Sequence, residues 1–164
     1  MPNGTELQTT TYDHPDAVAL DDRVQLEYQE RYQGEGDATP LDPAMFLAPH
    51  GLYLLAYDPD GTPVASGAWR SQEKNEEGYS DGDAEIKRMY VVPEARGRGL
   101  ARRILTALET DARAAGRTRM VLETGDQQPE AIALYLSAGY TFCSKFGLYR
   151  DYDSSRCMAK PLHP

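Results

Sequence analysis

Apolar side chains recur at helical spacing in two long segments of the chain. Between Asp16 and Tyr32 they stand three or four positions apart, at Ala17, Leu20, Val24, Tyr28 and Tyr32. A second stripe, between Gly99 and Ala115, consists of Leu100, Ile104, Leu105, Leu108 and Ala112. Such spacing puts the apolar groups on one face of a helix, and Gly116 is a favourable residue for ending the second helix. The pattern therefore predicts two amphipathic helices.

Short apolar runs between turn-forming residues predict strands. Residues 51–57 and 63–70 flank an Asp-Gly step, which favours a hairpin. Residues 84–92 form a strand that ends before Pro93, because proline lacks the N–H that a ladder needs. The other expected strands cover residues 6–12, 120–124, 140–145 and 155–160, and a short helix covers residues 129–137.

The order of these elements predicts an α/β layered fold with a mixed sheet. It reads strand, helix, three strands, helix, strand, helix and two strands. A length of 164 residues suits one domain, spanning 1–164, and is too short for two separate cores.

The charge balance makes nucleic acid an unexpected partner. The chain has 26 acidic and 17 basic residues, a formal net charge of −9, whereas affinity for phosphate backbones comes from clustered lysine and arginine. A local group of bases instead suits a small anion; it consists of Arg96, Arg98, Arg102 and Arg103. No apolar stretch is long enough to cross a bilayer, and the first residues do not resemble a secretory signal, so we expect no membrane partner and a cytoplasmic protein.

Neither cysteine nor histidine is arranged as a catalytic or metal site. Cys143 and Cys157 favour free core thiols, with a pairing across neighbouring strands as the alternative. The histidines are scattered, at His14, His50 and His163. They suggest neither a triad nor a zinc site, so we expect no metal.

The segment VVPEARGRGLARRIL, residues 91–105, is a candidate anion site. A strand ends, and a helix begins at Gly97 and Gly99 between arginines. Free N–H groups and the helix dipole favour an anion there, and glycine permits its close approach. No G-K-[ST] follows, and Arg102 replaces the third glycine of a dinucleotide fingerprint. An ordinary glycine-containing turn with solvated arginines is the alternative.

Residues 85–142 resemble the GNAT acetyltransferase superfamily. Its loop pattern [RQ]-x-x-G-x-[GA] is matched by Arg96, Gly99 and Ala101. The resemblance implies acetyl-coenzyme A as co-substrate, with its pyrophosphate held at this loop. The implied binding residues are Arg96, Gly97, Arg98, Gly99, Leu100, Ala101 and Arg102.

Residues 128–142 resemble a second motif of the family. Matching positions are Ala131, Leu134, Tyr135, Gly139 and Tyr140. The resemblance implies that the Tyr135 phenol lies near the coenzyme sulfur and protonates the leaving thiolate. A core aromatic packed on the sheet is the alternative. Gln128 replaces the usual asparagine and is expected to contact the pantetheine arm.

The strand AEIKRMYVV, residues 84–92, resembles the central strand of the family. Glu85 stands fourteen residues before Gly99, the offset of the catalytic glutamate in the histone-type branch, and is expected to act as general base, directly or through water. A solvated acid at a strand end is the alternative. The resemblance further implies that the backbone of Met89, Tyr90 and Val91 pairs with the pantetheine amides, with Val91 N–H stabilising the oxyanion.

The similarity extends more weakly over the whole chain to small bacterial GNAT proteins of unassigned acceptor. It implies a single-domain, mixed and largely antiparallel sheet, splayed centrally and flanked by helices. Residues 1–83 would form the acceptor side, 84–142 the acetyl-coenzyme A motifs, and 143–164 the closing strands. Many relatives pair, so a homodimer is one expectation.

The acceptor site is expected near the first helix and the loop that follows it. Tyr28, Tyr32 and Phe46 are candidate lining residues. Glu35 and Asp37 would favour a cationic amine, or form a solvated acidic surface. The conflicting indication, a carboxylate-bearing acceptor such as an amino acid, comes from Arg70 and Arg88.

Two functions fit this sequence. The first is an N-acetyltransferase that acetylates a primary amine of a small-molecule or amino-acid-like acceptor by direct attack in a ternary complex. The second is a non-catalytic acyl-coenzyme A-binding or sensing domain. A sensor needs no proton-transfer groups, so the presence of both Glu85 and Tyr135 favours the enzyme.

Overall fold

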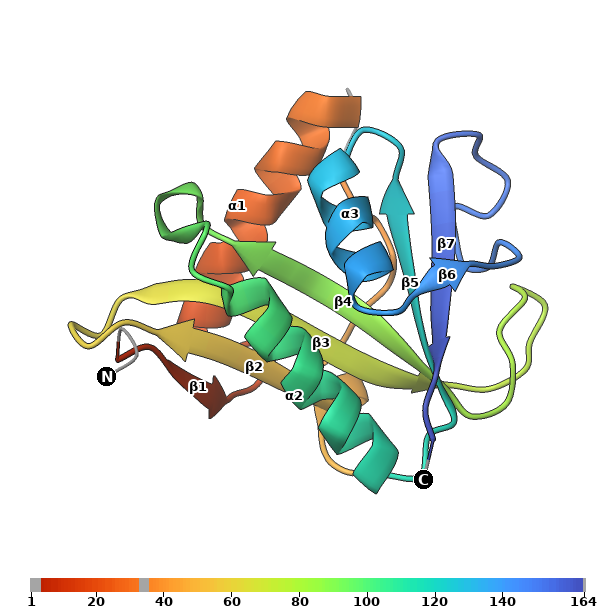
Figure 1. The fold of residues 1–164 in the computed structure, drawn as a ribbon, viewed down its shortest axis with the longest axis horizontal. Coiled ribbons are helices and arrows are strands. Elements are labelled where there is room, and N and C mark those ends of the chain that lie inside the picture. The colour runs from red at the N-terminus through yellow and green to blue at the C-terminus, as the bar shows by residue number, and fades with distance from the viewer. Residues whose placement is uncertain (1–3, 33–35, 164) are drawn as a thin grey trace.

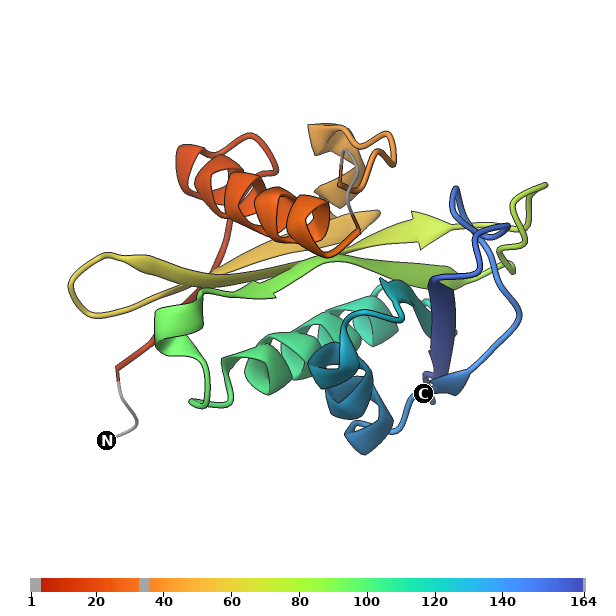
Figure 2. The same cartoon turned by 90° about the horizontal axis from the view of Figure 1, so that it is seen from above.

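One sheet with helices on both faces forms the framework (Figures 1 and 2). The computed structural model describes residues 4–32 and 36–163, and within them the sheet has seven strands. The strands are β1 (Glu6–Thr9), β2 (Gly51–Tyr57), β3 (Pro63–Gln72), β4 (Asp83–Val91), β5 (Arg119–Gly125), β6 (Thr141–Phe142) and β7 (Ser155–Pro161). The helices are α1 (Pro15–Tyr32), α2 (Leu100–Ala114) and α3 (Pro129–Ser137), with short 3₁₀ turns η1 (Pro43–Phe46) and η2 (Pro93–Ala95).

The sheet divides at its centre. Its strand order is β1-β2-β3-β4-β5-β7-β6, and every neighbouring pair is antiparallel except β4 and β5. That parallel pairing is limited to Asp83–Glu85 of β4 against Arg119–Val121 of β5. Beyond it the two strands diverge, as Figure 1 shows. The mixed, largely antiparallel and centrally splayed sheet expected from the sequence is confirmed.

Two predicted strands are shorter than expected. The segment predicted over 6–12 ends as a strand at Thr9, because the chain turns there towards α1. The segment predicted over 140–145 is a strand only at Thr141–Phe142. One further bond follows, from Cys143 N to Cys157 O, before the chain leaves β7 and Gly147 N donates to Glu77 O.

The helices cover opposite faces of the sheet. Figure 2 shows α1 and η1 above it and α2 and α3 below it. The predicted apolar stripe of α2 is buried, at Leu100, Ile104, Leu105, Leu108 and Ala112. At the far end of α2, Asp111 accepts a hydrogen bond of 2.9 Å from the Trp69 indole on β3. The stripe therefore anchors α2 along β3 and fixes where the helix begins.

A bulge interrupts the pairing of β3 with β4. The register shifts between Ser66 and Ala68, and Arg88 opposite them has a φ of 59°. Ser66 Oγ donates to Arg88 O at 2.8 Å, which helps hold this left-handed conformation. Gly67 lies at the same point, where an added Cβ would be 2.4 Å from Ile104 Cγ2 and 2.6 Å from Met89 Sδ. The bulge therefore brings β4 and α2 into close contact with the bare backbone of β3.

We expect Gly67→Ala to destabilise the protein by about 1–3 kcal/mol, because the methyl group overpacks this contact. Urea unfolding monitored by circular dichroism would measure the change. The cost should be smaller in an Ile104→Ala background, which removes one of the two clashing groups. Equal stability of Gly67→Ala and the wild type would contradict this account of the bulge.

Candidate functional site

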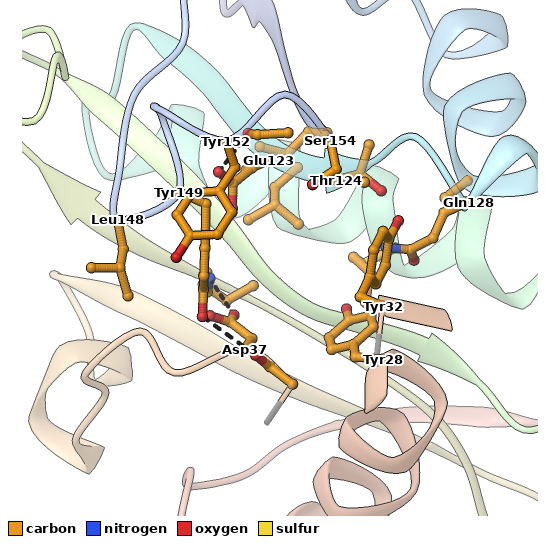
Figure 3. A pocket seen from close by; sticks show the side chains of 18 of the residues that line it. Tyr28, Tyr32, Asp37, Glu123, Thr124, Gln128, Leu148, Tyr149, Tyr152 and Ser154 are labelled. Atoms are coloured by element: carbon orange, nitrogen blue, oxygen red, sulfur yellow. Dashed lines mark hydrogen bonds and ion pairs between the residues drawn. The ribbon is translucent and has the colours of Figure 1, made fainter. Parts of the chain in front are cut away.

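A cavity of about 570 Å³ occupies the gap between the diverging strands (Figure 3). Its walls come from the end of α1 with residues 36–38, from β4, from β5 and α3, and from the loop before β7. The lining includes Tyr28, Tyr32, 36–38, Ile86–Met89, Leu122–Gly125, Gln128, Ala131, Tyr135, Leu148, Tyr149, Tyr152, Ser154 and Ser155. The splay thus turns the middle of the sheet into a concave site.

The edge of β4 that faces this gap carries backbone groups without a partner strand. Val92 N donates to Val64 O, so Val92 turns its backbone towards β3, and by alternation Tyr90 does so as well. Val91 therefore faces the opposite edge, where its carbonyl accepts a 3.0 Å bond from Arg96 Nε. Met89 lies on the same edge. The backbone N–H and C=O groups of Tyr90 point to β3, an orientation that does not suit the predicted pairing of Tyr90 with the pantetheine amides.

The glycine loop lies at the start of α2. Gly97 and Gly99 have φ values of 83° and 76°, a backbone conformation that favours glycine. Gly99 is the residue before the first turn of α2, whose N–H groups have no intrahelical partner. An added Cβ at either glycine meets nothing within 4 Å, so the surface beside the helix start is open.

The arginines of this loop are positioned by neighbouring elements. Arg98 donates to both oxygens of Asp58, at 2.9 and 3.1 Å, and Arg102 donates to Ser137 Oγ at 2.6 Å. Arg96 lies 3.4 Å from Glu27 and 5.9 Å from the centre of the Tyr90 ring. The structure therefore brings the predicted residues Arg96 to Arg102 together at a helix N-terminus. Among the described residues they lie beyond the lining of the cavity.

Tyr135 projects from α3 into the cavity. The residue is 6% exposed, and its ring contacts Tyr140 edge to face, with centroids 5.6 Å apart. Burial raises the pKa of the Tyr135 phenol well above its ordinary value. The phenol therefore keeps its proton at neutral pH and remains a hydrogen-bond donor. Gln128 lines the same wall, at the residue before α3.

Glu85 lies outside the lining of the cavity, in a network of its own. Its carboxylate accepts bonds from Arg70 Nε at 2.7 Å, Tyr79 Oη at 2.8 Å and Gln72 Nε2 at 3.1 Å, and the residue is 3% exposed. All three donors come from β3 and from the loop before β4, so the carboxylate is held within the sheet. The structure therefore places Glu85 away from the cavity lining, and Arg70, predicted for the acceptor site, is paired with Glu85.

The other predicted acceptor residues separate into two groups. Tyr28, Tyr32 and Arg88 line the cavity, whereas Phe46 is buried in the core against Tyr53, with ring centroids 5.5 Å apart. Phe46 therefore packs in the core from η1, on the same face of the sheet as α1 (Figure 2). The Glu35 prediction lies outside the described residues.

A buried charge cluster fixes the floor of the cavity. Asp37 is 2.7 Å from Lys87 Nζ and 2.8 Å from Arg88, whose Nε is 2.6 Å from Asp21. Burial opposes ionisation of Asp37, but the two cations prevail and hold its pKa well below the ordinary value. Arg88 is thus engaged by two carboxylates, and Asp37 is a permanent anion that positions β4 against α1.

The wall formed by β5 and the loop before β7 could not be predicted from the sequence. Glu123 lines the cavity with Tyr149 and Tyr152, and Ser155 Oγ donates to it at 2.7 Å. Burial raises the pKa of Glu123 to about 7. The sequence does contain one indication of this wall. The apolar run MVLET predicts a buried strand, and Glu123 is the lone acid within it.

Within residues 4–32 and 36–163, no helix is long and apolar enough to span a membrane. The same residues contain no cluster of three or more histidine, cysteine or acidic side chains that could bind a metal ion. Both cysteines in this part of the chain are free thiols.

Comparison with known proteins gives one family. The model of the "Acetyltransferase (GNAT) family" matches residues 17–140. An "IAA acetyltransferase" from Azospirillum brasilense is 38% identical over 99% of this chain and 100% of its own length. An "Aminoglycoside N(6')-acetyltransferase type 1" from Klebsiella aerogenes is 30% identical over 66% of each chain.

Solved structures show the same fold. A putative acyl-CoA N-acyltransferase from Klebsiella pneumoniae has a TM-score of 0.77 and 31% identity, over 97% of this chain and 98% of its own. The PaiA N-acetyltransferase of Thermoplasma acidophilum, crystallised with coenzyme A, has a TM-score of 0.65 at 15% identity, over 96% and 98% of the two chains.

We expect Arg70→Met to destabilise the protein by about 3–5 kcal/mol, because it leaves the Glu85 carboxylate buried without its cation. Thermal and urea unfolding would measure this loss. Adding Glu85→Gln should recover a large part of it, since the double variant buries no unpaired charge. Additive costs in the double variant would contradict a structural role for this pair.

Proposed function

The chain belongs to the acetyltransferase (GNAT) family, and on this premise we propose that it transfers an acetyl group from acetyl-coenzyme A to a primary amine of a small-molecule or amino-acid-like acceptor. The observation that carries the proposal is the unpaired edge of β4, which leads from the cavity to the glycine loop of α2. The two named relatives above act on small molecules by their names, which supports an acceptor of that size.

The chain offers a separate group for each part of acetyl-coenzyme A. Backbone N–H groups at the start of α2 suit the pyrophosphate, and the open glycines permit its approach. The backbone of Met89 and Val91 suits the amides of the pantetheine arm, in the manner of an added strand. Gln128 stands on the opposite wall as a further polar contact.

The residues of the cavity suit direct transfer in a ternary complex. The coenzyme supplies the acetyl group as a thioester, which the neutral amine attacks. Val91 N–H lies on the edge where it can stabilise the oxyanion that develops at the carbonyl. Tyr135, protonated at neutral pH, can donate its proton to the sulfur that departs. This sequence of events needs no covalent enzyme intermediate.

The acceptor side of the cavity lies opposite α3, between the end of α1 and the loop before β7. Figure 3 shows Tyr149 and Tyr152 on one side and Tyr28 and Tyr32 on the other, with Asp37 below. Aromatic rings on both sides suit an acceptor with an apolar body that carries the amine. A cytoplasmic location and a possible pairing of two copies stay predictions from the sequence.

We expect acetyl-coenzyme A to bind the wild type in a calorimetric titration and Gly99→Asp to abolish that binding. Aspartate adds a side chain and a negative charge where the pyrophosphate would lie. Gly116→Asp is the matched control, because Gly116 has a similar φ of 83° and open surroundings but lies beyond the opposite end of α2.

Retained binding in a folded Gly99→Asp protein would show that the coenzyme site is elsewhere. Binding that is lost in Gly99→Asp, together with no acetylation of any amine tested, would favour the alternative function of a non-catalytic acyl-coenzyme A sensor.

We expect Tyr135→Phe to lower kcat by about 100-fold, the usual contribution of a general acid, while the Kd for acetyl-coenzyme A changes little. Release of coenzyme A thiol would report the rate and calorimetry the affinity. Tyr12→Phe makes the same chemical change outside the cavity, beside Phe46, and should preserve both values. Wild-type turnover in Tyr135→Phe would leave Tyr135 with a packing role alone.

A further inference from the structure

Glu123 lines the cavity that we propose for the acceptor and the coenzyme arm. It stands on β5 beyond the last residue of that strand that pairs with β4, so its side chain enters the gap. On β7 it is opposite Cys157, and Ser155 lies two residues further on the same face. Figure 3 shows Glu123 beside Tyr149 and Tyr152, across the cavity from Tyr28 and Tyr32.

Glu123, which is partly buried, differs from the buried acids in having no ion-pair partner among the described residues. Glu85 is paired with Arg70, Asp83 with Arg119 and Glu109 with Lys160. Asp37, the second acid of the cavity, is paired with two cations. Of these carboxyl groups, Glu123 is the one whose charge the protein leaves for a ligand to balance.

The hydrogen bonding of Glu123 leaves one oxygen available. Ser155 Oγ donates to Oε2 at 2.7 Å, and Oε1 has no partner among the described residues. This single donor orients the carboxyl group without neutralising it. An incoming ammonium group can therefore donate to Oε1 directly.

The charges around Glu123 oppose one another. Burial is the strongest influence and raises its pKa, while the Ser155 hydrogen bond and Lys87 on β4 lower it, and Asp37 and Glu85 raise it. Tyr149 in the facing loop and Cys157 on β7 also stand within its electrostatic reach, and burial raises the pKa of both groups. The result, about 7, places the carboxyl midway between its two forms at neutral pH, as proton exchange requires.

Resting on the proposed function, we propose that Glu123 is the general base of the reaction and that the acceptor enters as a cationic primary amine. The amine's N–H bond breaks as its proton moves to Glu123 Oε1. The freed nitrogen lone pair forms a C–N bond with the thioester carbonyl carbon, whose π electrons move to the carbonyl oxygen. The tetrahedral intermediate then collapses: the C=O bond re-forms, the C–S bond breaks, and the nitrogen loses its second proton to solvent, which leaves a neutral amide. The sulfur takes the proton of Tyr135, and solvent restores both residues.

The first test follows the carboxyl group itself and needs no acceptor. Carbon-13 NMR of protein with labelled glutamate side chains should show one carboxyl that titrates near pH 7 in the wild type and is missing from Glu123→Gln. A Glu123 carboxyl that titrates near its ordinary value of about 4.3 would overturn the proposal. If the wild type did not bind acetyl-coenzyme A, the proposed function would fail. The titration would still decide the protonation state of Glu123, so the two failures can be told apart.

The second test measures kcat against pH, with coenzyme A release from acetyl-coenzyme A and the fastest acceptor from a panel of aryl-alkyl and aliphatic primary amines. The wild-type kcat should rise tenfold per pH unit below about 7 and then level off, because only the ionised base accepts a proton. Glu123→Gln should lose this rise and at least about 100-fold in kcat, with an unchanged Kd for acetyl-coenzyme A.

Two further variants separate a base from a structural residue. Glu130→Gln makes the same change on the exposed surface of α3 and should preserve the wild-type profile. Ser155→Ala removes the bond that favours the ionised form, so the rise should shift to higher pH while the plateau remains. A wild-type profile in Glu123→Gln, or a rise lost in Glu85→Gln but kept in Glu123→Gln, would overturn the assignment.

Discussion

The parallel pairing of β4 with β5 is the constraint on which the rest of this molecule depends. It joins only three residue pairs, from Asp83 with Arg119 to Glu85 with Val121. Had it continued, the cavity would be filled by a regular sheet, and the backbone of Met89 and Val91 would be bonded to β5. The two halves of the sheet must therefore be held together firmly at the point where the pairing stops, and apart beyond it.

Ion pairs lie on either side of that point. Glu85 is the last paired residue of β4, and its bonds to Arg70 and Tyr79 tie β3 and the preceding loop to this position. Two residues further on, Lys87 and then Arg88 are bound by Asp37, which ties β4 to the segment after α1 just beyond the pairing with β5. Glu85, which resembles a catalytic group in sequence, thus lies in the structure at the point where the two strands begin to diverge.

Much of the fold could be predicted because it depends on local patterns. The buried face of α2 follows from its spacing, and the glycine loop follows from residues adjacent in the chain. The site could be predicted only in part, since its chemistry depends on distant neighbours. The partners of Glu85 come from β3 and from the loop before β4, and Glu123 owes its protonation behaviour to burial and to a serine on β7. Contacts between residues so distant in sequence leave no periodic pattern from which they could be predicted.

The unpaired edge of β4 also has a consequence for self-association. An exposed strand edge is a template on which another chain can add a strand, and proteins usually protect such edges. Here the edge is enclosed between α1 and α3, and Tyr32 closes the far end of the gap so tightly that a Cβ on Gly125 would lie 1.7 Å from its hydroxyl oxygen. The side chains that shape the cavity therefore also cover this edge, and Tyr32 narrows the approach to it at one end.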